Sequence, residues 1–163
     1  MIDDREFLYG AAFLRLIDSG EQISITYLAE IHQSIYLVET THSQSAILFK
    51  VSKKPKSAWS FTLSIQEESA LNVLHCEYPD CLVFLALVCH RDGICCIAEE
   101  RLRTVLDESV KMSSQYISVS RKPRGSYHVS GPGRQKMEQT IPQSDWPRIV
   151  LSHKNNRYES YTD

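Results

Sequence analysis

The sequence predicts a mixed α/β (α+β) protein, in which helices flank a central mixed β-sheet. Apolar residues at helical spacing alternate along the chain with short segments rich in β-branched residues. The run from Cys81 to Cys89 has no polar side chain, which is typical of a strand covered on both faces. With 163 residues, 42% of them hydrophobic, we expect one domain over residues 1–151 and a frayed C-terminal tail over residues 152–163.

The N-terminal third of the chain predicts one helix followed by four strands. Asp3 and Glu6 have the spacing of a helix cap, so we expect a helix over residues 4–18 that ends before Gly20. The apolar stripe expected to face the core consists of Phe7, Leu8, Ala11, Phe13, Leu14 and Ile17. Alternating segments then predict strands at residues 23–28, 35–40, 46–51 and 58–63.

The middle of the chain predicts a capped helix and a hairpin. Ser64 and Glu67 form a capping box, so a helix is expected to begin there and to end at Tyr78. Asp92 and Gly93 are a strong turn signal between two apolar segments. The elements expected after that helix are a central strand at 81–89, a returning strand at 94–98 and a helix at 99–107.

The C-terminal part predicts a second hairpin and little else. Its strands are expected at residues 116–120 and 126–130. From Arg134 onward the sequence shows little periodicity. Trp146 and the apolar residues 149–151 are the expected points at which this segment docks on the core.

Composition limits the cellular setting and the metal chemistry. Five cysteines cannot all pair within the chain, and none has the paired spacing of a zinc site. We therefore expect free, mostly buried thiols, as in a reducing compartment. No apolar run is long enough to span a membrane, and the first residues lack the pattern of a signal peptide. The expectation is a cytoplasmic protein without a membrane partner.

Two basic turns are the clearest candidate for a binding surface. Residues 111–163 carry nine basic and four acidic side chains, although the whole chain has a net charge of −2. Val51-Ser-Lys-Lys-Pro-Lys and Val119-Ser-Arg-Lys-Pro-Arg repeat one pattern, and each is followed three residues later by an aromatic residue. We expect both turns on one side of the molecule, where cations and rings would bind nucleic acid. The predicted contact residues are Lys53, Lys54, Lys56, Trp59, Arg121, Lys122, Arg124 and Tyr127.

A candidate catalytic centre follows from the order of elements. Glu39 lies on one predicted strand and Leu48-Phe-Lys50 on the next, within the order α-β-β-β-α-β followed by a C-terminal hairpin. This arrangement resembles the core of the PD-(D/E)xK, or restriction-endonuclease-like, superfamily. The resemblance implies a Mg²⁺-dependent nuclease with Glu39 as the first acid and Lys50 as the catalytic lysine. Leu48 replaces the second acid, and Glu68 of the following helix is the implied substitute because Glu67 belongs to the capping box. The implied metal ligands are Glu39 and Glu68.

Several functions remain open. One is a nucleic-acid-associated protein with a nuclease-like core that is degenerate in its metal site. Another is a protein-interaction module, such as an immunity-type or regulatory subunit, whose basic turns bind an acidic partner. A third is a homodimer formed through an exposed strand edge, and the turns could also be plain solvated hairpin tips. The segments around Lys54–Thr62 and Leu87–Ile94 also resemble a family of uncharacterised bacterial proteins. The sequence has no phosphate-binding P-loop and no GxSxG motif.

Overall fold

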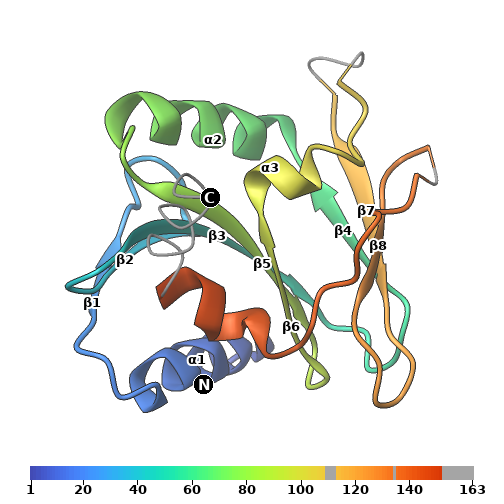
Figure 1. Ribbon diagram of the computed structural model, residues 1–163, viewed down its shortest axis with the longest axis horizontal. Helices are drawn as coiled ribbons and strands as arrows, with labels where there is room; N and C mark the ends of the chain where they lie inside the picture. The colour runs from blue at the N-terminus through green and yellow to red at the C-terminus, as the bar shows by residue number, and fades with distance from the viewer. Residues whose placement is uncertain (109–112, 134, 152–163) are drawn as a thin grey trace, which may run out of the picture.

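The computed structural model describes residues 1–108, 113–133 and 135–151, and it confirms the predicted fold class. The structure contains a five-stranded mixed sheet, a three-stranded sheet and the helices that pack against them (Figure 1). The larger sheet and its helices comprise α1 (Asp4–Asp18), β1 (Ser24–Tyr27), β2 (Ile35–Glu39), β3 (Gln44–Ser52), α2 (Ile65–Glu77), β5 (Leu82–Cys89) and β6 (Gly93–Ala98). The other elements are β4 (Trp59–Leu63), α3 (Glu99–Leu102), β7 (Gln115–Ser120) and β8 (His128–Ser130).

The larger sheet has the strand order β1-β2-β3-β5-β6. Strands β3 and β5 are parallel, whereas the other neighbouring pairs are antiparallel. A parallel pair needs a crossover connection, and the segment that contains β4 and α2 supplies it. Strand β5 has a neighbour on each side, and Phe84 and Leu85 are fully buried. The prediction that residues 81–89 form a central strand is therefore confirmed.

Helices cover both faces of the larger sheet (Figure 1). The helix α1 and the helical residues 145–151 lie on one face, and α2 lies on the other. Ile47 and Phe49 of β3 pack in the core on the α1 side. Ala46 and Leu48, which alternate with them along β3, pack in the core on the α2 side. The sheet thus separates two hydrophobic cores.

The smaller sheet has the order β4-β7-β8 and is antiparallel. Trp59 of β4 is paired with Val119 of β7, and Leu63 is paired with Gln115. The sequence predicted the hairpin of β7 and β8 but not its third strand, because β4 finds its partner about fifty residues later in the chain. Such non-local pairing leaves no local signal in a sequence.

The face of α1 that packs on the sheet differs from the predicted stripe. The N-cap is as predicted, since Asp3 Oδ1 accepts a hydrogen bond from the backbone N–H of Glu6 at 2.7 Å. The residues that α1 buries are Leu8, Tyr9, Ala12 and Leu16. The residues that remain more than half exposed, although predicted to be buried, are Phe7, Leu14 and Ile17. Because α1 carries apolar residues on both sides, spacing alone could not identify its buried face.

Two further predictions need correction at the C-terminal side. The helix α3 ends at Leu102 rather than at residue 107, because turns occupy residues 103–105. Residues 145–151 are helical although their sequence showed no clear periodicity. The docking points themselves are confirmed, since Trp146 and Val150 are buried against the α1 side of the sheet. The predicted frayed tail, residues 152–163, lies outside the described residues.

All five cysteines are free thiols, and four of them are buried. Burial, with a smaller contribution from the nearby carboxylate of Glu39, raises the pKa of the Cys81 thiol to about 11. Burial likewise raises the pKa values of Cys89, Cys95 and Cys96. These thiols therefore remain protonated and unreactive. Within the described part of the chain, no helix is long and apolar enough to cross a membrane.

Candidate functional site

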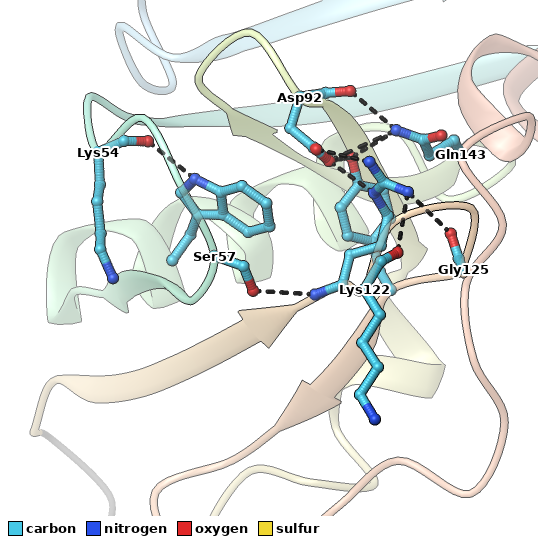
Figure 2. A network of polar contacts seen from close by, with 9 residues as sticks. Lys54, Ser57, Asp92, Lys122, Gly125 and Gln143 are labelled. Atoms are coloured by element: carbon cyan, nitrogen blue, oxygen red, sulfur yellow. Dashed lines mark hydrogen bonds and ion pairs between the residues drawn. The ribbon is translucent and has the colours of Figure 1, made fainter.

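The two basic turns, residues 53–58 and 121–126, lie next to each other and are called here the basic rim. Their proximity follows from the pairing of β4 with β7, because one turn leads into β4 and the other leaves β7. The backbone N–H of Arg121 donates a hydrogen bond to Ser57 Oγ at 3.1 Å, which joins the turns directly (Figure 2). The structure therefore places the two turns on the same side of the molecule, as the sequence predicted.

Most cations of the basic rim point into solvent. The exposed ones are Lys53, Lys54, Lys56, Lys122 and Arg124. Among the described residues, none of these five has a carboxylate partner. Lys54 Nζ donates a hydrogen bond to the backbone oxygen of Ala58 at 2.6 Å, so part of its bonding capacity serves its own turn. The rim thus presents a compact group of positive charges that is not neutralised internally.

Arg121 has a different role, because it forms an ion pair with Asp92 in the turn between β5 and β6. Its guanidinium donates from Nε and Nη2 to the two carboxylate oxygens, at 2.9 and 2.7 Å (Figure 2). The Tyr127 hydroxyl donates to Asp92 at 2.9 Å, and Gln143 Nε2 donates to the backbone oxygen of Asp92 at 2.8 Å. The hydrogen bonds from Arg121 hold the pKa of Asp92 below its usual range.

The Asp92 network connects three separate parts of the chain. Asp92 follows β5, Arg121 follows β7, and Gln143 precedes the C-terminal helical segment. Arg121 Nη1 also donates to the backbone oxygens of Lys122 and Gly125, at 3.2 and 3.3 Å, and so shapes the second basic turn. Sequence reasoning treated Asp92 only as a turn residue and missed Gln143. The charge of Arg121 is therefore used within the protein and is not a free ligand of a phosphate.

The two aromatic residues predicted to stack on bases are buried. Trp59 is 1% exposed and Tyr127 is fully buried, and their rings contact edge to face with centroids 6.2 Å apart. Trp59 Nε1 donates a hydrogen bond to the backbone oxygen of Lys54 at 2.9 Å, which fixes the first turn. The stacking prediction is wrong for both rings. Their recurrence in the repeated pattern has a structural cause, since each ring anchors one basic turn to a shared core.

The three residues of the implied catalytic centre do not come together. Glu39 of β2 is paired with Gln44 at the start of β3, and Glu39 Oε2 accepts a hydrogen bond from Gln44 Nε2 at 3.2 Å. Lys50 lies six residues further along β3, a separation of about 20 Å at about 3.3 Å per residue. Glu68 begins α2, beside the Lys50 end of the strand, and forms an ion pair with Arg103 at 2.6 Å. Glu39 and Glu68 therefore do not fit a shared magnesium ion.

Lys50 is paired with Glu67 instead of Glu68. Its Nζ lies 2.6 and 2.8 Å from the two carboxylate oxygens of Glu67, whose side chain is only 7% exposed. Glu67 also accepts from the backbone N–H of Ser64, so the predicted capping box is present and the same carboxylate serves both partners. Two features of the sequence point to this pair. Lys50 lies on the side of β3 that faces α2, and the capping box places Glu67 in the first turn of α2. The described residues contain no group of three or more histidine, cysteine or acidic side chains that could hold a metal ion.

Glu68 belongs to an ion-pair network beside a groove between α2 and the segment that follows α3. The groove has a volume of about 520 Å³. Arg103 lines the groove and donates to Glu68 at 2.6 Å and to Glu99 at 2.7 Å. His75 Nε2 lies 2.6 Å from the other oxygen of Glu99. This arrangement commits Glu68 to holding α2 against α3.

The Lys50–Glu67 pair gives a test of its structural role. We expect Lys50→Met to lower the free energy of unfolding by about 1–2 kcal/mol, because a largely buried carboxylate loses its main partner. Glu67→Gln in the same chain should recover most of this loss, since glutamine retains the cap and carries no charge. Urea denaturation of the two single variants and the double variant measures the coupling. Additive losses in the double variant would show that the two side chains do not act as a pair.

Comparisons with known proteins found no match to this chain among family models, curated proteins or solved structures.

Proposed function

We propose that the protein binds the phosphate backbone of nucleic acid through the basic rim. The supporting observation is that two separate turns, joined by the Arg121–Ser57 hydrogen bond, gather exposed cations without carboxylate partners. Lys53, Lys56 and Lys122 have no internal hydrogen bond from their ammonium groups among the described contacts. Ammonium and guanidinium groups that are held close together replace counterions along a phosphate backbone and gain free energy from their release.

The buried rings define the kind of nucleic acid expected. Single-stranded ligands are usually bound by exposed aromatic side chains on which bases stack. Trp59 and Tyr127 do not offer such a surface. A rim that supplies charge alone favours binding without sequence preference, and it favours a duplex, whose phosphates are regularly spaced.

We further propose that the larger sheet is a nuclease-like core that does not cleave the nucleic acid bound by the rim. The order of α1, the first three strands of the larger sheet, α2 and β5, interrupted by β4 of the smaller sheet, supports the likeness of the core to the restriction-endonuclease-like superfamily. Leu48 at the position of the second acid, and the distance of Glu39 from Lys50, support the loss of its metal chemistry. Incubation of the protein with duplex DNA and Mg²⁺ should therefore leave the DNA intact. Cleavage that is lost in Glu39→Ala or Lys50→Ala would contradict this part of the proposal.

Binding can be tested with a matched pair of double variants. Lys56→Gln/Lys122→Gln removes two charges from the rim. Arg101→Gln/Lys136→Gln is the control, because these two residues line one groove at the far end of β8, where Lys136 is bridged to Ser130. Fluorescence anisotropy with a labelled duplex, measured over a series of salt concentrations, gives the affinity and its salt dependence. We expect the rim variant to bind at least about tenfold more weakly and its slope of log K against log salt to shrink by about 1.8, or about 0.9 for each lost phosphate contact.

The control variant should bind nearly as the wild type does. Equal losses in the two double variants would contradict a localised interface, because general electrostatics would then explain the binding. An absence of duplex, single-stranded or RNA binding at low salt would also contradict the proposal. That result would favour an acidic protein as the partner of the rim, because opposite charges also speed the association of two proteins.

A further inference from the structure

One face of α1 is apolar and largely exposed, and the guanidinium of Arg91 lies over the Phe7 ring at its edge, 5.9 Å from the ring centroid. Phe7, Leu14 and Ile17 are 61%, 55% and 59% exposed, and the small residues Gly10 and Ala11 lie between them. The opposite face of the same helix is buried against the larger sheet. A helix with apolar residues on both sides is expected where both sides are covered.

We propose that this face of α1 binds the same face of a second copy of the chain, with the two helices antiparallel about a twofold axis. The axis would pass between Gly10 and Ala11. Phe7 and Leu14 lie at equal distances on either side of that midpoint, so a twofold rotation places Phe7 of each copy against Leu14 of the other. Such a surface is complementary to itself, which is the requirement for a closed dimer.

The residues at the midpoint allow close approach of the two helices. A Cβ atom built on Gly10 would meet no atom within 4 Å, so the space in front of it is open. With Gly10 and Ala11 facing their copies, the helix axes can approach to about 8 Å, the lower limit of ordinary helix packing. The larger side chains at each end, Phe7 and Leu14, then cover one another rather than meeting water.

Charges beside the apolar face agree with the antiparallel arrangement. Asp4 and Arg15 are eleven residues apart, which places them within about 20° of each other around the helix axis. They therefore flank the stripe on the same side and near its two ends. In an antiparallel pair, residues on the same flank face each other, so Arg15 of one copy lies opposite Asp4 of the other, twice. Both side chains are exposed, and neither has an ion-pair partner among the described residues.

A second copy suits this face better than a membrane surface does. Asp4 and Glu6 lie in the first turn of α1, and Asp3 caps it. These three carboxylates outnumber the two cations at this end of the helix, Arg5 and Arg91, so it would not attract the anionic lipids that amphipathic helices commonly bind. The exposed edge strand β1 is the competing route to a dimer, and its four residues are all exposed.

Sedimentation velocity of the full chain over a range of concentrations tests the proposal. We expect the wild type to shift from monomer toward twice the monomer mass as its concentration rises. Leu14→Asp should remain monomeric at every concentration, and Val73→Asp, which alters an exposed apolar residue on α2, should dimerise as the wild type does. Circular dichroism of each variant establishes that it is folded. Wild-type protein that stays monomeric at all concentrations would overturn the proposal.

Two further variants fix the geometry. Arg15→Asp should weaken the dimer at least tenfold, and Asp4→Arg added to it should restore the affinity, because the pair of charges is only exchanged. In a Cys76→Ser background, Ala11→Cys should form a disulfide-linked dimer under mild oxidation, since residue 11 lies beside the axis. A dimer that Thr26→Pro in β1 abolishes, while Leu14→Asp leaves it intact, would assign the interface to the strand edge and overturn the proposal.

Discussion

Replacing Asp92 with alanine is expected to lower the free energy of unfolding by about 2–4 kcal/mol. The substitution leaves the guanidinium of Arg121 and the hydroxyl of Tyr127 without their shared acceptor. Tyr127 is fully buried, so water cannot replace the lost bond without disturbing the core. The loss falls somewhat below that of a fully buried ion pair, because the Asp92 and Arg121 side chains are 18% and 15% exposed.

Urea denaturation at neutral pH measures this loss, and Asp80→Ala is the matched control. Asp80 is exposed, and its substitution should change the free energy of unfolding by less than about 0.5 kcal/mol. The loss of free energy of unfolding in Asp92→Asn should lie between those of the two alanine variants, since the amide oxygen still accepts one hydrogen bond. A loss in Asp92→Ala no larger than in Asp80→Ala would contradict the role of the network.

The same carboxylate gives stability a dependence on pH. Arg121 lowers the pKa of Asp92 in the folded protein relative to the unfolded chain, whose aspartates titrate near pH 4. The stabilising contribution is therefore complete above about pH 4 and is lost as the pH falls through the lower, folded-state pKa. Wild-type protein should lose stability in that acidic range more steeply than Asp92→Asn, which has no carboxylate to protonate.

Gly131→Ala is expected to destabilise the protein by about 3 kcal/mol or more. A Cβ atom at this position would lie 1.6 Å from the backbone oxygen of Val105, so one of the two backbone segments has to move. No rotation of a side chain relieves such a contact. Gly131 also donates a backbone hydrogen bond to Gln135 at 2.8 Å, which holds the chain in place.

Gly133→Ala provides the comparison two residues away. A Cβ atom there would meet only the side chain of Gln135, at ordinary contact distances of 3.6 Å and more. We expect a change within about 0.5 kcal/mol. Thermal unfolding followed by circular dichroism distinguishes the two variants, and equal melting temperatures would contradict the close approach of residues 131 and 105.

Local signals in the sequence were sufficient for most of the fold. Turn residues, β-branched segments and the capping box at Ser64 identified the helices α1 and α2 and every strand to within a few residues. These features depend on neighbours within about four positions. The pairing of β4 with β7 and the choice of the buried face of α1 depend on residues far away in the chain. Neither could be obtained from periodicity.

The candidate sites show the same division. The repeated basic pattern was enough to identify the two turns, because each turn carries its cations within one short segment of sequence. The structure then places both turns on one side of the molecule. Whether Glu39, Lys50 and Glu68 form one centre depends on how far apart they lie along β3. The order of helices and strands gives no information about that distance. The strand register pairs Glu39 of β2 with Gln44 at the start of β3, whereas Lys50 lies near the end of β3. The burial of Trp59 and Tyr127 was equally hidden, because a ring beside a basic turn suits a core and a ligand equally well.

The pairing of β4 with β7 has a consequence for synthesis of the protein on the ribosome. Strand β4 emerges about fifty residues before its partner, a delay of roughly 3–10 s at about 5–20 residues per second. During that interval the strand that contains Trp59, Phe61 and Leu63 lacks its hydrogen-bonding partner. The lysines of the first basic turn immediately precede this apolar strand, where charge opposes pairing with other nascent chains. We therefore expect the turn that presents positive charge in the finished protein also to disfavour aggregation of an unfinished chain.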